Sequence, residues 1–470
     1  MNAQRQEIPP TEIARQNDIM RRLGDKNSSR TIQPLAFVDT YGCQQNESDS
    51  ERLRGMLDCM GYRLTQNERE ADVIVINTCA VREHAEMRVF GNVGALVHTK
   101  KEKPEQIIAL CGCMVQQQHV ADKIRRSYRH VDLVFGPQAL WRFPELLEQV
   151  LLARGRVFSI DDAPDAIAEG LPVLRDGRVK AWLSIMYGCN NFCSYCIVPY
   201  VRGRERSRHP DDILSEARAL IKDGYKDLTL LGQNVNSYGR GLSEEIDFSE
   251  LLRRINALDG DFLIRFMTSH PKDASDRLFK AMADSPKVAH HLHLPFQAGS
   301  NRILAAMNRG YTKEQYLHLI EQARQFMPDI VLTSDIIVGF PGETYDEFLE
   351  TLDVIEKARF DALFTFLYSK REGTPAGRMP DDVPKQEKQR RFDDLLSRQN
   401  AISEEKHREY VGQTLRVLVD GKAEDVLYPL TGRTNGGRLV HLSGDQSKIG
   451  SFQNAAITHC NTWALFGELI

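Results

Sequence analysis

The sequence predicts an α/β protein in three parts: a doubly wound parallel-sheet domain, a partial (βα)6 barrel and a small antiparallel β-barrel. Between residues 34 and 150, continuous apolar runs alternate with helical patterns, which is typical of a parallel sheet covered on both faces. Between residues 179 and 378, six strand-like runs are separated by helix-length gaps. After Val411 the pattern changes to short strands and turns, which indicates a small barrel.

A chain of 470 residues is too long for one hydrophobic core, so we expect separate domains. We place them at residues 33–152, 175–405 and 408–470. Residues 1–32 form a polar extension that we expect to be disordered. The stretch 154–178 lacks periodicity and is predicted to be the first linker.

The strands of the first two domains are predicted from their apolar runs. Those of the N-terminal domain begin at Leu35, Val73, Ile107 and Val131. Those of the central domain begin near Trp182, Leu228, Leu263, His291, Val331 and Leu363. Six βα units fall short of the eight that close a barrel, so we expect an open one with its chemistry at the C-terminal strand ends. A polar helix, about 386–410, leads to the last domain.

The composition excludes little but constrains the partners. A net charge of −4 means that any nucleic-acid binding must come from local basic patches. No apolar stretch approaches the roughly 18 residues that span a membrane. Residues 1–31 lack the apolar core of a signal peptide. The nine cysteines therefore indicate a cytoplasmic protein with reduced thiols.

The most informative motif is a loop with the spacing C-x3-C-x2-C, formed by Cys189, Cys193 and Cys196. Three thiolates on so short a loop can bind three corners of a 4Fe–4S cluster and leave one iron without a protein ligand. The usual ligand of such an iron is S-adenosylmethionine, which binds through its amino and carboxylate groups and yields a radical. A structural zinc site is the alternative, but it needs a fourth ligand, and none stands at a suitable spacing.

A second set of cysteines, Cys43, Cys79 and Cys113, is spread over the N-terminal domain. Each lies in the turn after a predicted parallel strand, and such turns share one edge of the sheet. We therefore expect a second cluster with three protein ligands. The alternative is that these are buried structural thiols. Cys111 competes with Cys113, but Cys111 ends the strand whereas Cys113 reaches the turn.

Four stretches resemble the radical S-adenosylmethionine methylthiotransferases, and the likeness covers about residues 33–470. The stretches are Thr40-Tyr-Gly-Cys-Gln-Gln-Asn-Glu-Ser-Asp-Ser-Glu, Asn77-Thr-Cys-Ala-Val-Arg-Glu-His-Ala-Glu, Gly188-Cys-Asn-Asn-Phe-Cys-Ser-Tyr-Cys-Ile-Val-Pro-Tyr-Val-Arg-Gly-Arg-Glu and Gly232-Gln-Asn-Val-Asn-Ser-Tyr-Gly. The resemblance implies an auxiliary-cluster domain, a radical S-adenosylmethionine barrel and a C-terminal TRAM domain that binds RNA.

The resemblance also implies a reaction. The substrate would be tRNA carrying N6-isopentenyladenosine beside the anticodon, and the product its 2-methylthio derivative. Two 4Fe–4S clusters and two molecules of S-adenosylmethionine per turnover are implied, with sulfur held at the auxiliary cluster of Cys43, Cys79 and Cys113. The electron donor would be a flavodoxin or ferredoxin. We expect a monomer with no membrane association, whose N-terminal sheet edge caps the barrel mouth; the sulfur source is unknown.

Other strand ends supply candidate contacts for S-adenosylmethionine. Gln233 and Asn234 follow the second barrel strand, and Thr333 and Asp335 lie on the fifth. The following Gly339-Phe-Pro-Gly-Glu resembles the family's adenosine region, although a turn before a helix explains it equally well.

Two charged patterns have an alternative explanation each. Four alternating arginines contact either tRNA phosphates or nearby carboxylates: Arg202, Arg204, Arg206 and Arg208. His291 and His293 share a strand face, where a hydrogen bond in the barrel interior is favoured over metal binding.

Three alternative functions stay open. Two are neighbouring activities, methylthiolation of threonylcarbamoyladenosine in tRNA and of an aspartate in a ribosomal protein. The third is a non-catalytic RNA-binding protein with structural metal sites. The Asn190-Asn191-Phe192 insert and the stretch from Val81 to Glu86 resemble the isopentenyladenosine type.

Overall fold

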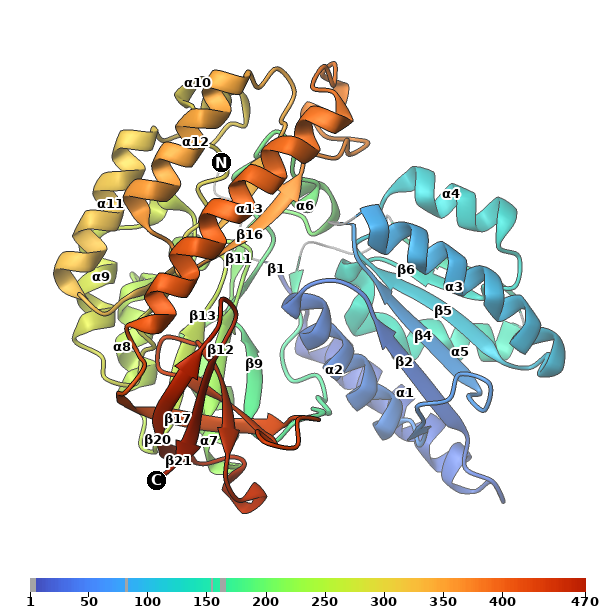
Figure 1. Cartoon of the computed structure of the whole chain (residues 1–470). Coiled ribbons are helices and arrows are strands. Elements are labelled where there is room, and N and C mark those ends of the chain that lie inside the picture. The colour runs from blue at the N-terminus through green and yellow to red at the C-terminus, as the bar shows by residue number, and fades with distance from the viewer. Residues whose placement is uncertain (1–5, 81–82, 154, 161–165) are drawn as a thin grey trace. The chain divides into compact units, whose positions relative to one another are not determined.

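The computed structural model describes residues 6–80, 83–153, 155–160 and 166–470 (Figure 1). The chain forms two compact units. The first comprises the described residues up to Asp176 together with 187–190 and 196–208, and the second contains the rest of the chain. The expectation placed on the stretch from Val81 to Glu86 falls partly outside the described residues, which leave out positions 81 and 82.

The first unit is built on a six-stranded parallel sheet in the order β3-β2-β4-β5-β6-β7. Every residue of the two central strands is buried, as expected for strands that are covered on both faces. The predicted strands are confirmed, and β3 and β7 extend the sheet at its two edges. The bounds are β2 (Leu35–Thr40), β3 (Arg63–Leu64), β4 (Val73–Thr78), β5 (Ile107–Gly112), β6 (Leu133–Phe135) and β7 (Val157–Ser159).

Helices cover both faces of this sheet, which confirms the doubly wound fold (Figure 1). One face packs against α1 (Pro10–Ser28), α2 (Gln44–Cys59) and α5 (Phe143–Ala153), and the other against α3 (Glu83–Glu102) and α4 (Gln118–Ser127). The unit also contains the 3-10 helix η1 (Pro137–Arg142), the paired strands β1 (Gln6–Glu7) and β8 (Ala166–Ile167), and the short elements α6 (Val198–Val201) and β11 (Arg206–Ser207).

The prediction that residues 1–32 are disordered is wrong for the greater part of this segment. Residues 10–28 form α1, which begins with Pro10 in its first turn, a position where proline's missing N–H costs nothing. Ile19, Met20 and Leu23 are buried against the core of the sheet. The segment is polar on average, but these apolar side chains share one face of the helix. Cys59, the last residue of α2, is exposed.

The second unit contains six parallel strands that follow one another in sequence order. Two three-stranded sheets, β9-β12-β13 and β14-β15-β16, are joined by a parallel bridge between Ile264 and Val288. The strands are β9 (Lys180–Ser184), β12 (Asp227–Leu231), β13 (Leu263–Phe266), β14 (His291–His293), β15 (Val331–Val338) and β16 (Ala362–Leu367). The six predicted strands of the open barrel are thus confirmed; the short β10 (Met186–Tyr187) precedes the cysteine loop.

Helices alternate with these strands and bury the apolar outer face of the barrel. They are α7 (Pro210–Lys222), α8 (Phe248–Asn256), α9 (Asp276–Ala283), α10 (Asn301–Ala306), α11 (Lys313–Phe326) and α12 (Tyr345–Ala358), with short 3-10 turns η2 (Val235–Ser237), η3 (Pro271–Asp273) and η4 (Ala376–Arg378). No described helix is long and apolar enough to cross a membrane.

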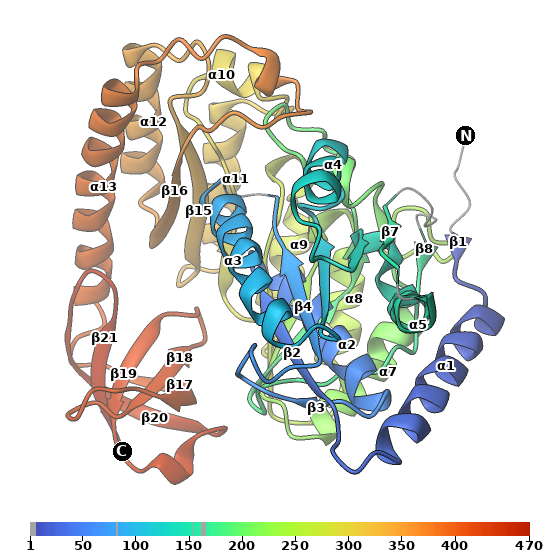
Figure 2. The same cartoon turned by 90° about the vertical axis from the view of Figure 1, so that its right-hand side faces the viewer.

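The long helix α13 (Lys385–Arg408) leads to a closed five-stranded barrel (Figure 2). Four strand pairs are antiparallel, but β19 and β21 are parallel, so the fully antiparallel barrel expected from the sequence is corrected at this pair. β20 pairs with β17, and the next strand, β21, lies between β20 and β19. This arrangement closes the barrel and makes β21 run parallel to β19. The bounds are β17 (Thr414–Lys422), β18 (Leu430–Thr434), β19 (Leu439–Ser443), β20 (Phe452–Cys460) and β21 (Leu465–Leu469), with η5 (Gln446–Lys448).

Buried ion pairs hold this barrel on the rest of the second unit. Arg438 is paired with Asp361, and both side chains are almost completely buried. Arg265 pairs with Asp227 at 2.9 Å and donates to the carbonyl oxygens of Thr434 and Asn435. Removing one partner of such a pair leaves an uncompensated buried charge, which is strongly destabilising. These contacts therefore fix the position of the barrel within the second unit.

Replacement of Ile19 by alanine tests the packing of α1. We expect it to destabilise the helix locally by about 2–5 kcal/mol, because it leaves a cavity under α1. Hydrogen exchange with mass spectrometry should show faster exchange across residues 10–28. Asp18→Ala, on the exposed face of the same helix, is the matched control and should leave exchange unchanged. Equal exchange in the two variants would show that α1 is not held by this contact.

Candidate active site

Three cysteines lie at one edge of the N-terminal sheet. Cys79 and Cys113 directly follow the adjacent strands β4 and β5, and Cys43 precedes α2 in the turn after β2. Cys79 and Cys113 are buried, and Cys43 is exposed. The turn after β2 lies tightly against Cys79: a Cβ atom on Gly42, whose φ is +117°, would be 2.7 Å from the Cys79 sulfur. Only glycine fits there.

Asn46 connects the turns that carry these cysteines. This fully buried side chain donates from Nδ2 to the carbonyl oxygens of Tyr41 and Thr78, at 2.7 and 2.9 Å. Tyr41 lies two residues before Cys43, and Thr78 directly precedes Cys79. The amide therefore fixes the backbone in front of two of the three thiols.

Arg202 approaches the third thiol. Its Nε donates to the Cys113 sulfur at 3.0 Å, and its Nη2 donates to Asn46 Oδ1 at 2.7 Å and to Asp49 Oδ2 at 2.9 Å. The residue is 5% exposed. Burial alone lowers the pKa of Arg202, but Cys113 and Asp49 raise it well above its usual value, so the guanidinium is charged.

Burial and neighbouring charges also shift the pKa values of the thiols. Burial raises the pKa of Cys113 to about 12, Arg202 opposes that rise, and the charges of Cys43 and Cys79 add to it. All three thiols follow adjacent parallel strands at one edge of the sheet. Burial also raises the pKa of Cys111 well above its usual value, and Cys111 packs in the apolar core beneath the sheet. Its position supports Cys113 as the ligand.

Three thiols at one edge of the sheet fit the ligand set of an iron–sulfur cluster, whose site stays a prediction. Among the described residues, no group of three His, Cys, Asp or Glu side chains is placed to hold a single ion. A single ion needs all its ligand atoms within about 2.0–2.4 Å of one point. Each sulfur that binds a cluster contacts a different iron, so the thiols need only border a common space. The buried guanidinium of Arg202 beside the Cys113 sulfur would also compensate the negative charge of thiolate ligands.

The C-x3-C-x2-C loop is divided between the two units. Cys189 and Cys196 belong to the first unit and Cys193 to the second. Cys189 and Cys193 are buried, and Cys196 is half-buried. In the first unit, Gly188 has a φ of +71°, and a Cβ atom there would lie 2.0 Å from the carbonyl oxygen of Arg204. Glycine is therefore required immediately before the first cysteine.

In the second unit, the segment after α10 anchors the middle of the loop. Asn308 donates to the carbonyl oxygen of Phe192 at 3.0 Å, and the Ser194 amide donates to that of Met307 at 2.9 Å. Arg309 is buried and its Nη1 lies 3.2 Å from the Cys193 sulfur. It also donates to the Tyr311 hydroxyl and to the carbonyl oxygen of Pro295. Nothing in the local sequence pattern marked Arg309.

The candidate contacts on β15 face the barrel interior. The Thr333 hydroxyl lies 3.0 Å from both His291 Nε2 and His293 Nδ1, and His293 Nε2 lies 3.5 Å from Asp335. Burial lowers the pKa of His291 to about 3, so this imidazole is neutral. The hydrogen bonds predicted for these histidines in the barrel interior are confirmed. Thr333 and Asp335 stay predicted S-adenosylmethionine contacts.

Two predicted S-adenosylmethionine contacts, Gln233 and Asn234, follow β12 and differ in burial. Asn234 is buried, its Nδ2 donates to Asp273 at 2.7 Å, and its Oδ1 has no hydrogen-bond partner among the residues that the structure describes. Gln233 is half-buried. A buried carbonyl oxygen without a partner is costly and marks a position where a ligand donor could bind. Both residues stay predicted ligand contacts.

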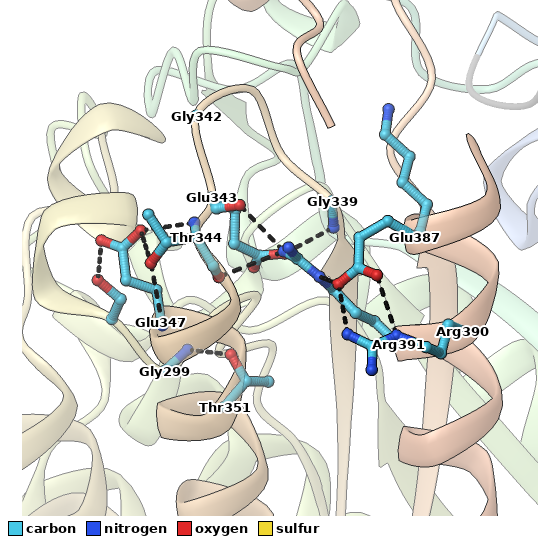
Figure 3. Close-up of polar contacts among 12 residues, drawn as sticks. Gly299, Gly339, Gly342, Glu343, Thr344, Glu347, Thr351, Glu387, Arg390 and Arg391 are labelled. Atoms are coloured by element: carbon cyan, nitrogen blue, oxygen red, sulfur yellow. Dashed lines mark hydrogen bonds and ion pairs between the residues drawn. The ribbon is translucent and has the colours of Figure 1, made fainter. Parts of the chain in front are cut away.

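The Gly339–Glu343 turn is closed by internal contacts (Figure 3). Glu343 accepts from the Gly339 amide at 2.8 Å and from Arg391 of α13 at 3.1 Å. Burial raises the pKa of Glu343, and Gly339 and Arg391 oppose that rise. Thr344 and Glu347 then form a capping box at the start of α12. These contacts give the turn a structural role, and a role in adenosine binding stays a prediction.

The arginine run after the cysteine loop is mostly not available to phosphates. Arg202 is buried as described, and Arg208 is buried and forms two hydrogen bonds with Glu169, at 2.7 and 2.8 Å. Arg206 donates to the carbonyl oxygens of Arg202 and Arg204. The carboxylate-paired alternative is thus confirmed for Arg202 and Arg208.

Family models match all three parts of the chain. An uncharacterized protein family, UPF0004, matches residues 36–136, the radical SAM superfamily matches 183–355, and the TRAM domain matches 408–470. Among solved structures, the radical S-adenosylmethionine methyltransferase TsrM of Kitasatospora setae has a TM-score of 0.56, with 15% identity over 73% of this chain and 75% of that chain. That likeness concerns the fold alone.

Curated relatives are similar over almost the whole length. The tRNA-2-methylthio-N(6)-dimethylallyladenosine synthase of Alkaliphilus oremlandii is 51% identical over 463 residues, 98% of each chain. The protein of the same name from Thermoanaerobacter sp. is 50% identical over 463 residues, again 98% of each chain. With this identity over its full length and a radical SAM domain at its centre, the chain belongs to the family of tRNA-2-methylthio-N(6)-dimethylallyladenosine synthases.

Proposed function

We propose that this enzyme adds a methylthio group to C2 of N6-isopentenyladenosine in tRNA and that it uses two 4Fe–4S clusters. The relatives' names and the TRAM domain support tRNA as the substrate. The observation that carries the two-cluster proposal is that two separate cysteine trios each include a sulfur that contacts a buried arginine: Cys113 with Arg202, and Cys193 with Arg309.

The chemistry of the substrate explains why cluster sites are needed. C2 of adenine is an unactivated aromatic carbon, beyond the acid–base chemistry of histidine or carboxylate side chains. With S-adenosylmethionine bound at the cluster of Cys189, Cys193 and Cys196, the cofactor supplies a carbon radical strong enough to break the C2–H bond. Cys43, Cys79 and Cys113 would hold the second cluster, where sulfur is presented and methylated.

Residues of the barrel interior would position the reactants. Thr333 and Asp335 lie on one face of β15 and offer a hydroxyl and a carboxylate to a nucleoside. Phe364 and Phe366 of β16 are 50% and 40% exposed. They lie on the same side of the sheet as Asp335, because Asp335 pairs with Phe364 in the parallel register. Exposed aromatic rings beside polar groups suit an adenine base with an apolar N6 substituent. The electron donor would be a flavodoxin or ferredoxin, and the enzyme a monomer.

Loss of one cysteine from either trio should have different effects. Cys193→Ala should abolish formation of 5′-deoxyadenosine and of product, because it removes a ligand of the radical-generating cluster. Cys79→Ala should abolish methylthiolation but keep part of 5′-deoxyadenosine formation. Both products are measured by liquid chromatography and mass spectrometry. Cys59→Ala is the matched control, because Cys59 is exposed and belongs to neither trio. Equal loss of both products in the two variants would disprove the division of roles.

The iron content distinguishes the proposal from a protein with structural zinc. After anaerobic reconstitution we expect about eight iron atoms per chain, since each cluster has four irons, and a broad absorption band at about 400 nm. The Cys43→Ala and Cys193→Ala variants should each fall to about four. A colourless protein with tightly bound zinc would instead support the non-catalytic alternative.

Substrate choice is tested in cells. A strain that lacks its own enzyme and expresses this chain should convert N6-isopentenyladenosine to the 2-methylthio form, as read by mass spectrometry of tRNA nucleosides. Methylthiolation of threonylcarbamoyladenosine, with isopentenyladenosine left unmodified, would assign the chain to the neighbouring activity. A Cys79→Ala chain expressed at the same level is the control for background modification.

A further inference from the structure

One polar network spans the whole of the first trio. Asn46 fixes the backbone before Cys43 and Cys79 through its two N–H groups, and its Oδ1 accepts from Arg202 Nη2 at 2.7 Å. Arg202 Nε then donates to the Cys113 sulfur. The amide and the guanidinium therefore link all three thiol-bearing turns with hydrogen bonds of 2.7–3.0 Å.

The network carries one fixed positive charge next to one cysteine sulfur. Arg202 is 5% exposed and Asp49, its carboxylate partner, is also 5% exposed, so water screens neither charge well. The guanidinium divides its donors between the carboxylate, the amide and the sulfur. Hydrogen bonds to cluster sulfurs and nearby charge are two of the factors that set a cluster's reduction potential.

Arg202 comes from a distant part of the sequence. It lies 89 residues from Cys113 and directly follows α6, a few residues after Cys196. The carbonyl oxygen of Val201 accepts from Gln138, and Ile197 and Val201 pack with Ala80 and Cys113. The whole segment is thus held against the turns of the first trio, which keeps the guanidinium in one place.

We propose that Arg202, oriented by Asn46 and Asp49, is the residue that positions Cys113 and sets the reduction potential of the auxiliary cluster. This inference rests on the proposed function, because it requires a cluster at Cys43, Cys79 and Cys113. Arg202 acts through the cysteine ligand, so it is a positioning residue. A guanidinium is suited to this role because it can donate to three partners at once, which an ammonium cannot do in the same geometry.

The experiment uses the full-length protein with Cys189, Cys193 and Cys196 replaced by alanine, so that only the auxiliary site can hold a cluster. Its midpoint potential is measured anaerobically by titration followed by electron paramagnetic resonance, with iron per chain as a second readout. In this background, Arg202→Gln should shift the potential to more negative values, because a positive charge is lost. We expect at least a tenfold change in the oxidised-to-reduced ratio at a fixed poise, which corresponds to about 59 mV for one electron.

Two further variants separate electrostatics from folding. Asp49→Asn keeps the shape but removes the negative charge, so it should shift the potential to more positive values. Arg202→Lys keeps the charge without the shared hydrogen bonds and should give an intermediate shift with lower iron content. Arg204→Gln, two residues further along and exposed, is the matched control and should change neither value.

Each outcome of these measurements either supports or overturns the proposed role of Arg202. Opposite shifts in Arg202→Gln and Asp49→Asn support the proposal. A cluster retained at the unchanged potential in both variants overturns it and leaves Arg202 a purely structural role. If Arg202→Gln does not fold, the Asp49→Asn shift decides alone, and its absence overturns the proposal. If the triple-alanine background itself binds no cluster, the proposed auxiliary site is wrong, and this inference fails with it.

Discussion

The constraint on which the site depends is that adjacent parallel strands end at the same edge of a sheet. β2, β4 and β5 are neighbours, and a cysteine follows each of them in the next turn. Three thiols that are 36 and 34 residues apart in sequence are thereby brought to one edge without any local motif. The core beneath them is covered by helices on both faces, which makes this edge a rigid base.

Burial of the thiols opposes their ionisation, and the surrounding side chains compensate for this effect. Thiols bind iron as thiolates, and an apolar environment disfavours the ionised form. Each trio has a buried arginine at one sulfur, Arg202 at Cys113 and Arg309 at Cys193, although the two arginines come from unrelated segments. Their own hydrogen bonds to carbonyl, amide or carboxylate groups fix where the charge lies. A buried arginine at one sulfur is thus a shared feature of the two trios.

Much of this arrangement could be predicted from the sequence, because it depends on local patterns. Continuous apolar runs gave the strands, and the place of Cys113 beyond the end of β5 distinguished it from Cys111, which lies in the strand. Long-range contacts could not be predicted. The alternating pattern of Arg202 and its neighbours left phosphate contact and carboxylate pairing open, and it could not identify the partner, because Arg202 is buried against Asp49, 153 residues away. α1 was missed for the same reason, since its few apolar residues matter only against the sheet.

The central claim is that the two trios hold separate iron–sulfur clusters. Anomalous diffraction at the iron edge, from crystals of the anaerobically reconstituted enzyme, tests it most directly. The account predicts two iron-containing peaks, one bordered by Cys43, Cys79 and Cys113 with Arg202 beside it, and one bordered by Cys189, Cys193 and Cys196. A single peak at the second trio, with the three thiols of the N-terminal sheet free of metal, would contradict it.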